Sequence, residues 1–125
     1  MKKWLVAVLL LGAAVRFYRL DRVPLGYAFD EVGIAYDAFS ITTWHRDQFA
    51  NFMPVSFKSF GDYKPPLMIC LTGLIYGFTG PQLIIVRLIS ASAGLGAIGA
   101  IYWLAKEIVP NQKWLPWFAA LIVAI

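Results

Sequence analysis

Apolar residues fall into four runs along the chain, and most polar residues lie between these runs. The runs cover residues 4–20, 65–80, 82–104 and 114–125. A helix needs about 20 predominantly apolar residues to cross a membrane. The pattern therefore predicts an all-α polytopic membrane protein with three full transmembrane helices and the start of a fourth. On this interpretation residues 1–125 are the amino-terminal part of one membrane domain.

The first apolar run has two interpretations. A basic start, a short apolar stretch and the small residues Gly12-Ala13-Ala14 are typical of a cleaved signal peptide. Because further apolar runs follow, we favour a retained transmembrane helix. Lys2 and Lys3 then place the amino terminus in the cytoplasm and the loop 21–64 on the extracytoplasmic side. The six Lys and Arg residues from Arg16 to Lys64 oppose this orientation.

The polar loop at residues 21–64 is expected to hold an interfacial amphipathic helix and an irregular stretch. The helix is predicted to start at Asp30, after a turn marked by Pro and Gly. Its apolar stripe suits a position in the membrane interface and consists of Val32, Ala35, Tyr36, Phe39 and Thr43. Residues 48–60 show no clear period and predict an ordered aromatic loop. The rings expected to pack at the interface, on lipid or on sugar are Trp44, Phe49, Phe52, Phe57 and Phe60.

Composition supports a membrane protein and argues against other classes. The chain is 60% apolar and 14% charged, with a mean hydropathy of +0.67, whereas soluble domains have about 25% charged residues. The net charge of +4 comes from scattered Lys and Arg without a basic run, so no nucleic acid partner is expected. The single cysteine, Cys70, excludes a disulfide framework, and the sequence has no metal-ligand spacing.

Three groups of ionisable residues stand at the predicted membrane boundaries, where a charge costs less than in hydrocarbon. Asp30-Glu31 follows the first run, Lys64-Pro65-Pro66 opens the second, and Arg87 lies early in the third. In this order and spacing they resemble the amino-terminal part of the GT-C glycosyltransferases, particularly the protein O-mannosyltransferases and the bacterial lipid A aminoarabinose transferases. The similarity covers about residues 4–110.

This resemblance implies a multi-pass enzyme of the inner (plasma) membrane with its active-site loop on the extracytoplasmic side. Such an enzyme moves a sugar from a polyprenyl-phosphate carrier to a lipid, glycan or protein acceptor. The sugar donor and membrane lipids are therefore the expected partners. The sequence identifies no cofactor and leaves the need for a divalent cation open. Because these enzymes have further transmembrane helices, we expect the 125-residue chain alone to be inactive.

Transfer from such a carrier requires a base for the acceptor proton and a positive group for the departing phosphate. Asp30 is the expected base, partly desolvated at the membrane rim, and Glu31 is expected to orient the acceptor or bind a cation. The alternative for both acids is ordinary helix capping. Lys64 is expected to bind the carrier phosphate, and its alternative is an anchor at the lipid head groups.

The remaining candidates are Arg87, Asp62 and Tyr63. Arg87 either pairs with a buried carboxylate or phosphate or extends to the interface. Asp62 and Tyr63 adjoin Lys64 and are expected to line the site. The alternative function is a non-catalytic polytopic membrane subunit or a transporter segment, in which Asp30 caps a helix and the small residues 90–100 serve helix assembly.

Overall fold

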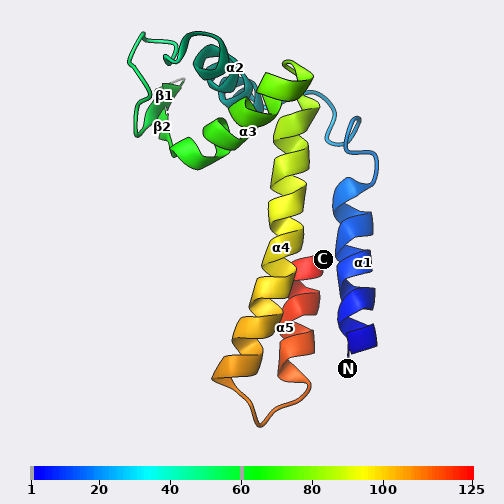
Figure 1. Cartoon of the computed structure of the whole chain (residues 1–125). Coiled ribbons are helices and arrows are strands. Elements are labelled where there is room, and N and C mark those ends of the chain that lie inside the picture. Colours follow the sequence, from blue (N-terminus) through cyan, green and yellow to red (C-terminus); the bar gives the residue numbers. More distant parts are fainter. Residues whose placement is uncertain (1, 60) are drawn as a thin grey trace. The chain divides into compact units, whose positions relative to one another are not determined.

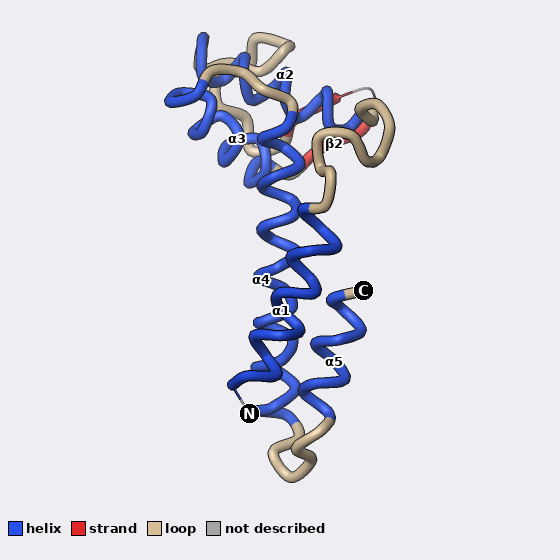
Figure 2. Tube along the Cα trace, turned by 90° about the vertical axis from the view of Figure 1, so that its right-hand side faces the viewer, coloured by secondary structure: helices blue, strands red, loops and turns tan. Residues whose placement is uncertain are grey.

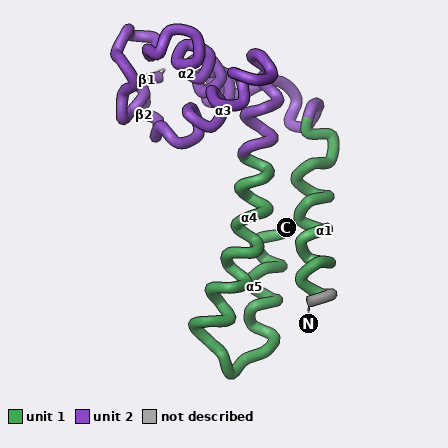
Figure 3. Tube along the Cα trace, in the orientation of Figure 1, with its two compact units in different colours: residues 1–20, 90–125 green, residues 21–89 purple. Residues whose placement is uncertain are grey.

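The structure, a computed structural model, describes residues 2–59 and 61–125 (Figure 1). The elements follow one another as α1 (Lys2–Phe17), α2 (Phe29–Trp44), β1 (Phe57–Ser59), β2 (Asp62–Lys64), α3 (Pro66–Thr79), α4 (Ile84–Ile108) and α5 (Leu115–Ala124). They form two compact units, which are coloured separately in Figure 3. Unit 1 comprises residues 1–20 and 90–125, and unit 2 comprises residues 21–89, so α4 contributes to both.

The boundaries of the two helices in unit 2 follow from local backbone chemistry. Pro65 and Pro66 start α3, where a fixed φ suits the helix and a missing N–H costs no hydrogen bond. Helix α2 starts at Phe29, and the Glu31 carboxylate accepts a hydrogen bond of 3.1 Å from the backbone N–H of Ala28. It ends at His45, which adopts the left-handed conformation with φ 56°.

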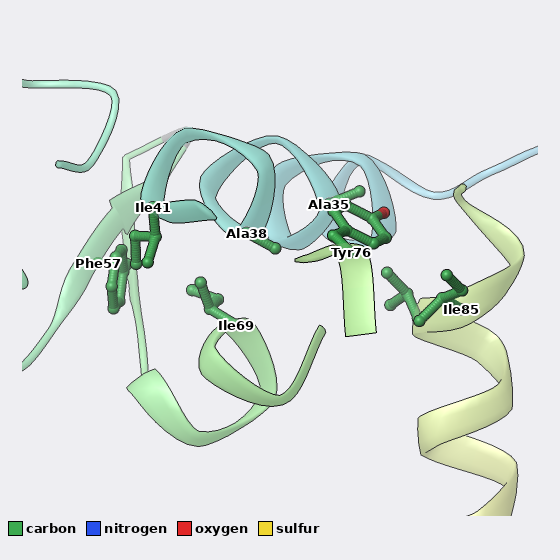
Figure 4. Packing of buried hydrophobic residues seen from close by; sticks show 8 residues of the cluster. Ala35, Ala38, Ile41, Phe57, Ile69, Tyr76 and Ile85 are labelled. Atoms are coloured by element: carbon green, nitrogen blue, oxygen red, sulfur yellow. The ribbon is translucent and has the colours of Figure 1, made fainter. Parts of the chain in front are cut away.

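The core of unit 2 is formed by the packing of α2 against α3, with β1 and the start of α4 at its edges. Figure 4 shows its central side chains, which are Ala35, Ala38, Ile41, Phe57, Ile69, Tyr76 and Ile85. Gly73 allows the two helices to approach closely, because a Cβ at this position would lie 3.2 Å from the backbone oxygen of Ala38. Helix α3 therefore buries one face against protein.

Only part of the apolar stripe predicted for α2 packs on protein, since Ala35 and Phe39 contact the core of unit 2. Val32 and Tyr36 are exposed, whereas the helix buries its small residues together with Asp37 and Ser40. The close packing of α2 on α3 explains why small residues are buried, since only small side chains fit where the α2 backbone lies against Gly73. The predicted stripe and the face that packs on α3 thus overlap only in part.

The all-α prediction is wrong as well, because β1 and β2 form an antiparallel two-stranded sheet (red in Figure 2). Phe57 pairs with Lys64 and Ser59 pairs with Asp62. Phe57 and Ser59 are both buried, so this face of β1 belongs to the core. Phe57 therefore packs inside unit 2, whereas Trp44, Phe49 and Phe52 are exposed and Phe60 lies outside the described residues.

Unit 1 consists of α1, residues 90–108 of α4, and α5, and it is held together by a small core around Ile98, Ala120 and Ala124. Arg16 of α1 donates hydrogen bonds to the backbone oxygens of Val123 and Ala124, the latter at 2.9 Å.

The prediction of three full transmembrane helices and the start of a fourth is wrong. Among the helices of the described residues, only the 25-residue α4 is long and apolar enough to span a membrane. Helices α1 and α3 have 16 and 14 residues, and at about 1.5 Å per residue the longer of them falls short of a hydrocarbon core of about 30 Å. The first predicted helix, residues 4–20, extends too far at its carboxyl end, because Tyr18, Arg19 and Leu20 form a turn.

Candidate functional site

The first candidate pair joins Asp30, in the first turn of α2, to Lys64, the last residue of β2. The Lys64 Nζ donates a hydrogen bond of 2.8 Å to Asp30 Oδ1. The two side chains differ in exposure, since that of Lys64 is 9% exposed and that of Asp30 is 78% exposed. The pair therefore combines a buried cation with a carboxylate that is open to solvent.

The Asp30–Lys64 pair lines a cavity of about 270 Å³ within unit 2. Asp62, Tyr63 and Pro65 contribute from the hairpin and the entry to α3, and Ile34 and Met68 contribute apolar side chains from α2 and α3. The structure thus brings together four predicted site residues, which are Asp30, Lys64, Asp62 and Tyr63. Charged groups stand beside apolar ones there, as expected of a site for an amphipathic ligand.

The second candidate pair joins Glu31 to Arg87, in the first turn of α4. The guanidinium donates to both carboxylate oxygens at 3.0 Å. It also donates to the backbone oxygens of Pro24 and Gly26 and stacks on the ring of Tyr27, with 4.4 Å from Cζ to the ring centroid. The hydrogen bond from Arg87 is the main reason why the pKa of Glu31 is lowered. Arg87 thus fixes the loop that precedes α2.

These contacts bear on several of the alternatives. Glu31 is a helix-capping acid, whereas Asp30 makes no capping hydrogen bond among the described residues. Arg87 has a half-buried carboxylate partner, and neither it nor Glu31 lines the cavity around Lys64. The protein itself leaves the Asp30 side chain largely exposed at the start of α2.

Sequence reasoning missed Asp37, which lies off the predicted stripe but is 0% exposed. Neither of its carboxylate oxygens has a hydrogen-bond partner among the described residues. The pKa of Asp37 is raised from 3.8 to about 6, chiefly by burial; the backbone of Gln48 lowers it, the charge of Asp47 raises it and the charge of Lys64 lowers it. Its spacing of seven residues from Asp30 is the signal that was available, because two helical turns return to the same face.

Asp47 is the acid that shapes the loop after α2. Its Oδ1 accepts hydrogen bonds of 2.9 and 2.8 Å from the backbone N–H groups of Phe49 and Asn51, and its Oδ2 accepts one of 2.9 Å from the Asn51 side chain. Burial opposes its ionisation, but these hydrogen bonds outweigh burial and lower the pKa of Asp47. A negative charge is therefore held near Asp37.

Within residues 2–59 and 61–125, no group of three or more His, Cys, Asp and Glu side chains is arranged to hold a metal ion. Comparisons with protein-family models, with curated proteins and with solved structures gave no match.

Proposed function

We propose that this chain carries the acid–base site of a glycosyltransferase that takes its sugar from a polyprenyl-phosphate donor. The main support is the 2.8 Å contact between Lys64 and Asp30 at the edge of a cavity. A volume of about 270 Å³ is just below the range of about 300–1,000 Å³ for small-molecule sites. Such a space suits one sugar or phosphate group rather than a whole carrier lipid.

The two side chains have complementary roles in this reaction. Asp30 takes the proton of the acceptor hydroxyl or amine as that group forms a bond to the anomeric carbon of the sugar. The bond from this carbon to the phosphate oxygen breaks, and the Lys64 ammonium stabilises the negative charge on the departing phosphate. The high exposure of Asp30 gives an acceptor access to the base, and the burial of Lys64 strengthens its attraction to phosphate.

We place this site at the extracytoplasmic face of the inner (plasma) membrane, anchored by α4. This helix is long and apolar enough to cross a membrane, and Arg87 in its first turn holds the segment that leads into α2. Lys106 and Lys113 follow at the opposite end, and positive residues favour the cytoplasmic side. A donor at the amino-terminal end of α4 keeps its prenyl tail in lipid.

The test is a transfer assay with the full-length protein in liposomes and labelled polyprenyl-phosphate sugars. Asp30→Asn is expected to reduce turnover about 100-fold or more, the usual effect of losing a general base. Lys64→Gln is expected to lose donor binding. Asp21→Asn is the matched control, because Asp21 is an exposed acid that pairs with Arg22 outside the cavity. Turnover of Asp30→Asn at the wild-type rate would refute the assignment.

The contacts of Arg87 favour a second candidate, a non-catalytic membrane subunit. All three nitrogen atoms of its guanidinium donate to protein acceptors, which is a structural arrangement. If the Asp30–Lys64 pair has only a structural role, Asp30→Asn will lower the stability of the chain. The wild type and the variant will then show the same donor binding and turnover, or neither protein will show any. The assay and an unfolding measurement on the same variants separate the two candidates.

A further inference from the structure

A groove in unit 1 lies between one face of α1 and one face of α5. The lining side chains repeat at i, i+3, i+4 and i+7 along each helix, which is the spacing of a single helix face. The groove has a volume of about 560 Å³, within the range of about 300–1,000 Å³ for small-molecule sites. Its lining residues are Trp4, Ala7, Val8 and Leu11 on the α1 side and Lys113, Trp114, Trp117, Phe118 and Leu121 on the α5 side.

The groove has a polar, aromatic end and an apolar end. Helices α1 and α5 run in the same direction, and Figures 1 and 2 show the start of α1 at the same end of unit 1 as the turn between α4 and α5. Trp4, Lys113 and Trp114 stand at this end. Leu11 and Leu121 close the groove about two helical turns, or about 10 Å, further along. A ligand that fits both ends has a polar head and an apolar chain.

Ring contacts hold the aromatic wall of the groove in place. Trp117 packs on Tyr102 of α4 with 4.6 Å between ring centroids, and Trp114 packs on Phe118 with 6.0 Å between ring centroids. A wall that is already formed reduces the ordering cost of binding. Tryptophan rings are enriched at the boundary between hydrocarbon and water in membrane proteins. The aromatic end of the groove therefore suits the level of the lipid head groups.

The charge of unit 1 favours an anionic head group. Residues 1–20 and 90–125 contain six Lys and Arg residues and one acid, Glu107. Within the described part of the chain, no acid lines the groove and no ion pair includes Lys113. Lys113 is exposed, and a lysine ammonium binds phosphate as a point charge.

We infer that the groove binds one anionic phospholipid, with its phosphate at the Lys113 ammonium and one acyl chain between α1 and α5. The third helix of unit 1 is α4, which is long and apolar enough to cross a membrane, so acyl chains surround the unit. The groove follows the chain for about 10 Å, and one leaflet supplies half of a hydrocarbon core of about 30 Å. Lys106 and Lys113 favour the cytoplasmic leaflet, which is rich in anionic lipid.

The test is native mass spectrometry of the full-length protein, released from detergent micelles that contain equal amounts of phosphatidylglycerol and phosphatidylcholine. The wild type is expected to retain one phosphatidylglycerol in preference to phosphatidylcholine. Lys113→Gln should lower the affinity for phosphatidylglycerol about tenfold, the effect of losing a hydrogen bond to a charged group.

Lys106→Gln is the matched control, because Lys106 is an exposed lysine in the last turn of α4 that does not line the groove. It should change the affinity by about twofold or less, since a more distant exposed charge is screened. Equal losses in the two variants would indicate general attraction to a basic surface and would overturn the inference.

A second pair of variants tests the place of the acyl chain. Ala7→Phe should lower the affinity about tenfold or more, because the ring occupies the space of several buried methylene groups. Ala14→Phe should have no effect, since Ala14 lies two turns further along the same face of α1, exposed and outside the groove. Unchanged binding in Ala7→Phe, as when another part of the full-length protein covers the groove, would sink the inference.

Inorganic phosphate separates a lipid site from a simple phosphate site. An excess of phosphate should leave the lipid bound, because the acyl chain supplies most of the contact with the groove. Displacement of the lipid by phosphate alone would contradict the inference. The groove shares no lining residue with the cavity around Lys64, so a negative result here leaves the proposed transferase function unaffected.

Discussion

Replacing Asp37 by Asn should stabilise the chain at neutral pH, and most of this gain should disappear in acid. The Asp37 carboxylate is fully buried without a hydrogen-bond partner among the described residues, so its charged form is held in an unfavourable place. Asn has nearly the same shape and carries no charge at any pH. The comparison therefore isolates the free energy of ionising one buried carboxyl group.

The size of the effect follows from the pKa of Asp37, which burial raises from 3.8 to about 6. A difference of about two pH units, at about 1.4 kcal/mol per unit, corresponds to about 3 kcal/mol. Since the folded state binds the proton more tightly, the contribution of Asp37 is fully present below pH 3.8 and is lost as the pH rises through 6. The advantage of Asp37→Asn should grow over that interval and then stay constant.

The assay is denaturant unfolding of wild type and Asp37→Asn in the same micelles at intervals between pH 4 and 8. Other acids titrate in both proteins and cancel in the difference, and any cost of burying the Asn amide is an offset that does not vary with pH. A difference in unfolding free energy that stays constant from pH 4 to 8 would show that Asp37 does not ionise in a desolvated site, and the reasoning would fail.

Three further predictions concern the packing of unit 2. Glu31→Gln should lower the free energy of unfolding by about 3 kcal/mol, because it leaves the buried Arg87 charge without its carboxylate. Asp21→Asn, the control in an exposed ion pair, should change the free energy of unfolding by less than about 1 kcal/mol. Because the pKa of Glu31 is lowered, its contribution is present above pH 4.5 and is lost in stronger acid, a loss that unfolding of Glu31→Gln should not show. Gly73→Ala should lower stability by about 1–3 kcal/mol through its clash with α2, while Gly77→Ala, with open space around it, should be neutral or slightly stabilising in the same assay.

The helices of unit 2 were predictable from short-range signals, and their tertiary contacts were not. Pro65 and Pro66 mark the start of α3 in sequence and in structure. The count of transmembrane helices failed because an apolar run gives the maximum length of a helix rather than its observed length. Helix α3 shows a related difficulty, since a run predicted to cross the membrane buries Ile69 and Tyr76 in the core that it forms with α2.

The candidate site was only partly predictable, for a reason that concerns distance along the chain. Asp30 and Lys64 are 34 residues apart, and Glu31 and Arg87 are 56 residues apart. Their residue types suggested chemistry, but only the fold determines which acid meets which base. The hairpin that buries Lys64 has strands of three residues each, too short for a period-two pattern to be recognised. Asp37 was overlooked because an acid on a helix is usually placed on its solvated face.

The exposure of the partners separates two ion pairs that looked equivalent in the sequence. Both Arg87 and Glu31 are largely buried, and Arg87 also binds backbone carbonyls, so removing either partner would strand a charge and loosen the loop before α2. In the other pair the cation is buried and the carboxylate is open to solvent. An exposed base can exchange protons with an acceptor and with water, whereas a buried ammonium keeps its position and its field. Asp30 and Lys64 therefore have the asymmetry that the proposed acid–base chemistry uses, and Glu31 and Arg87 do not.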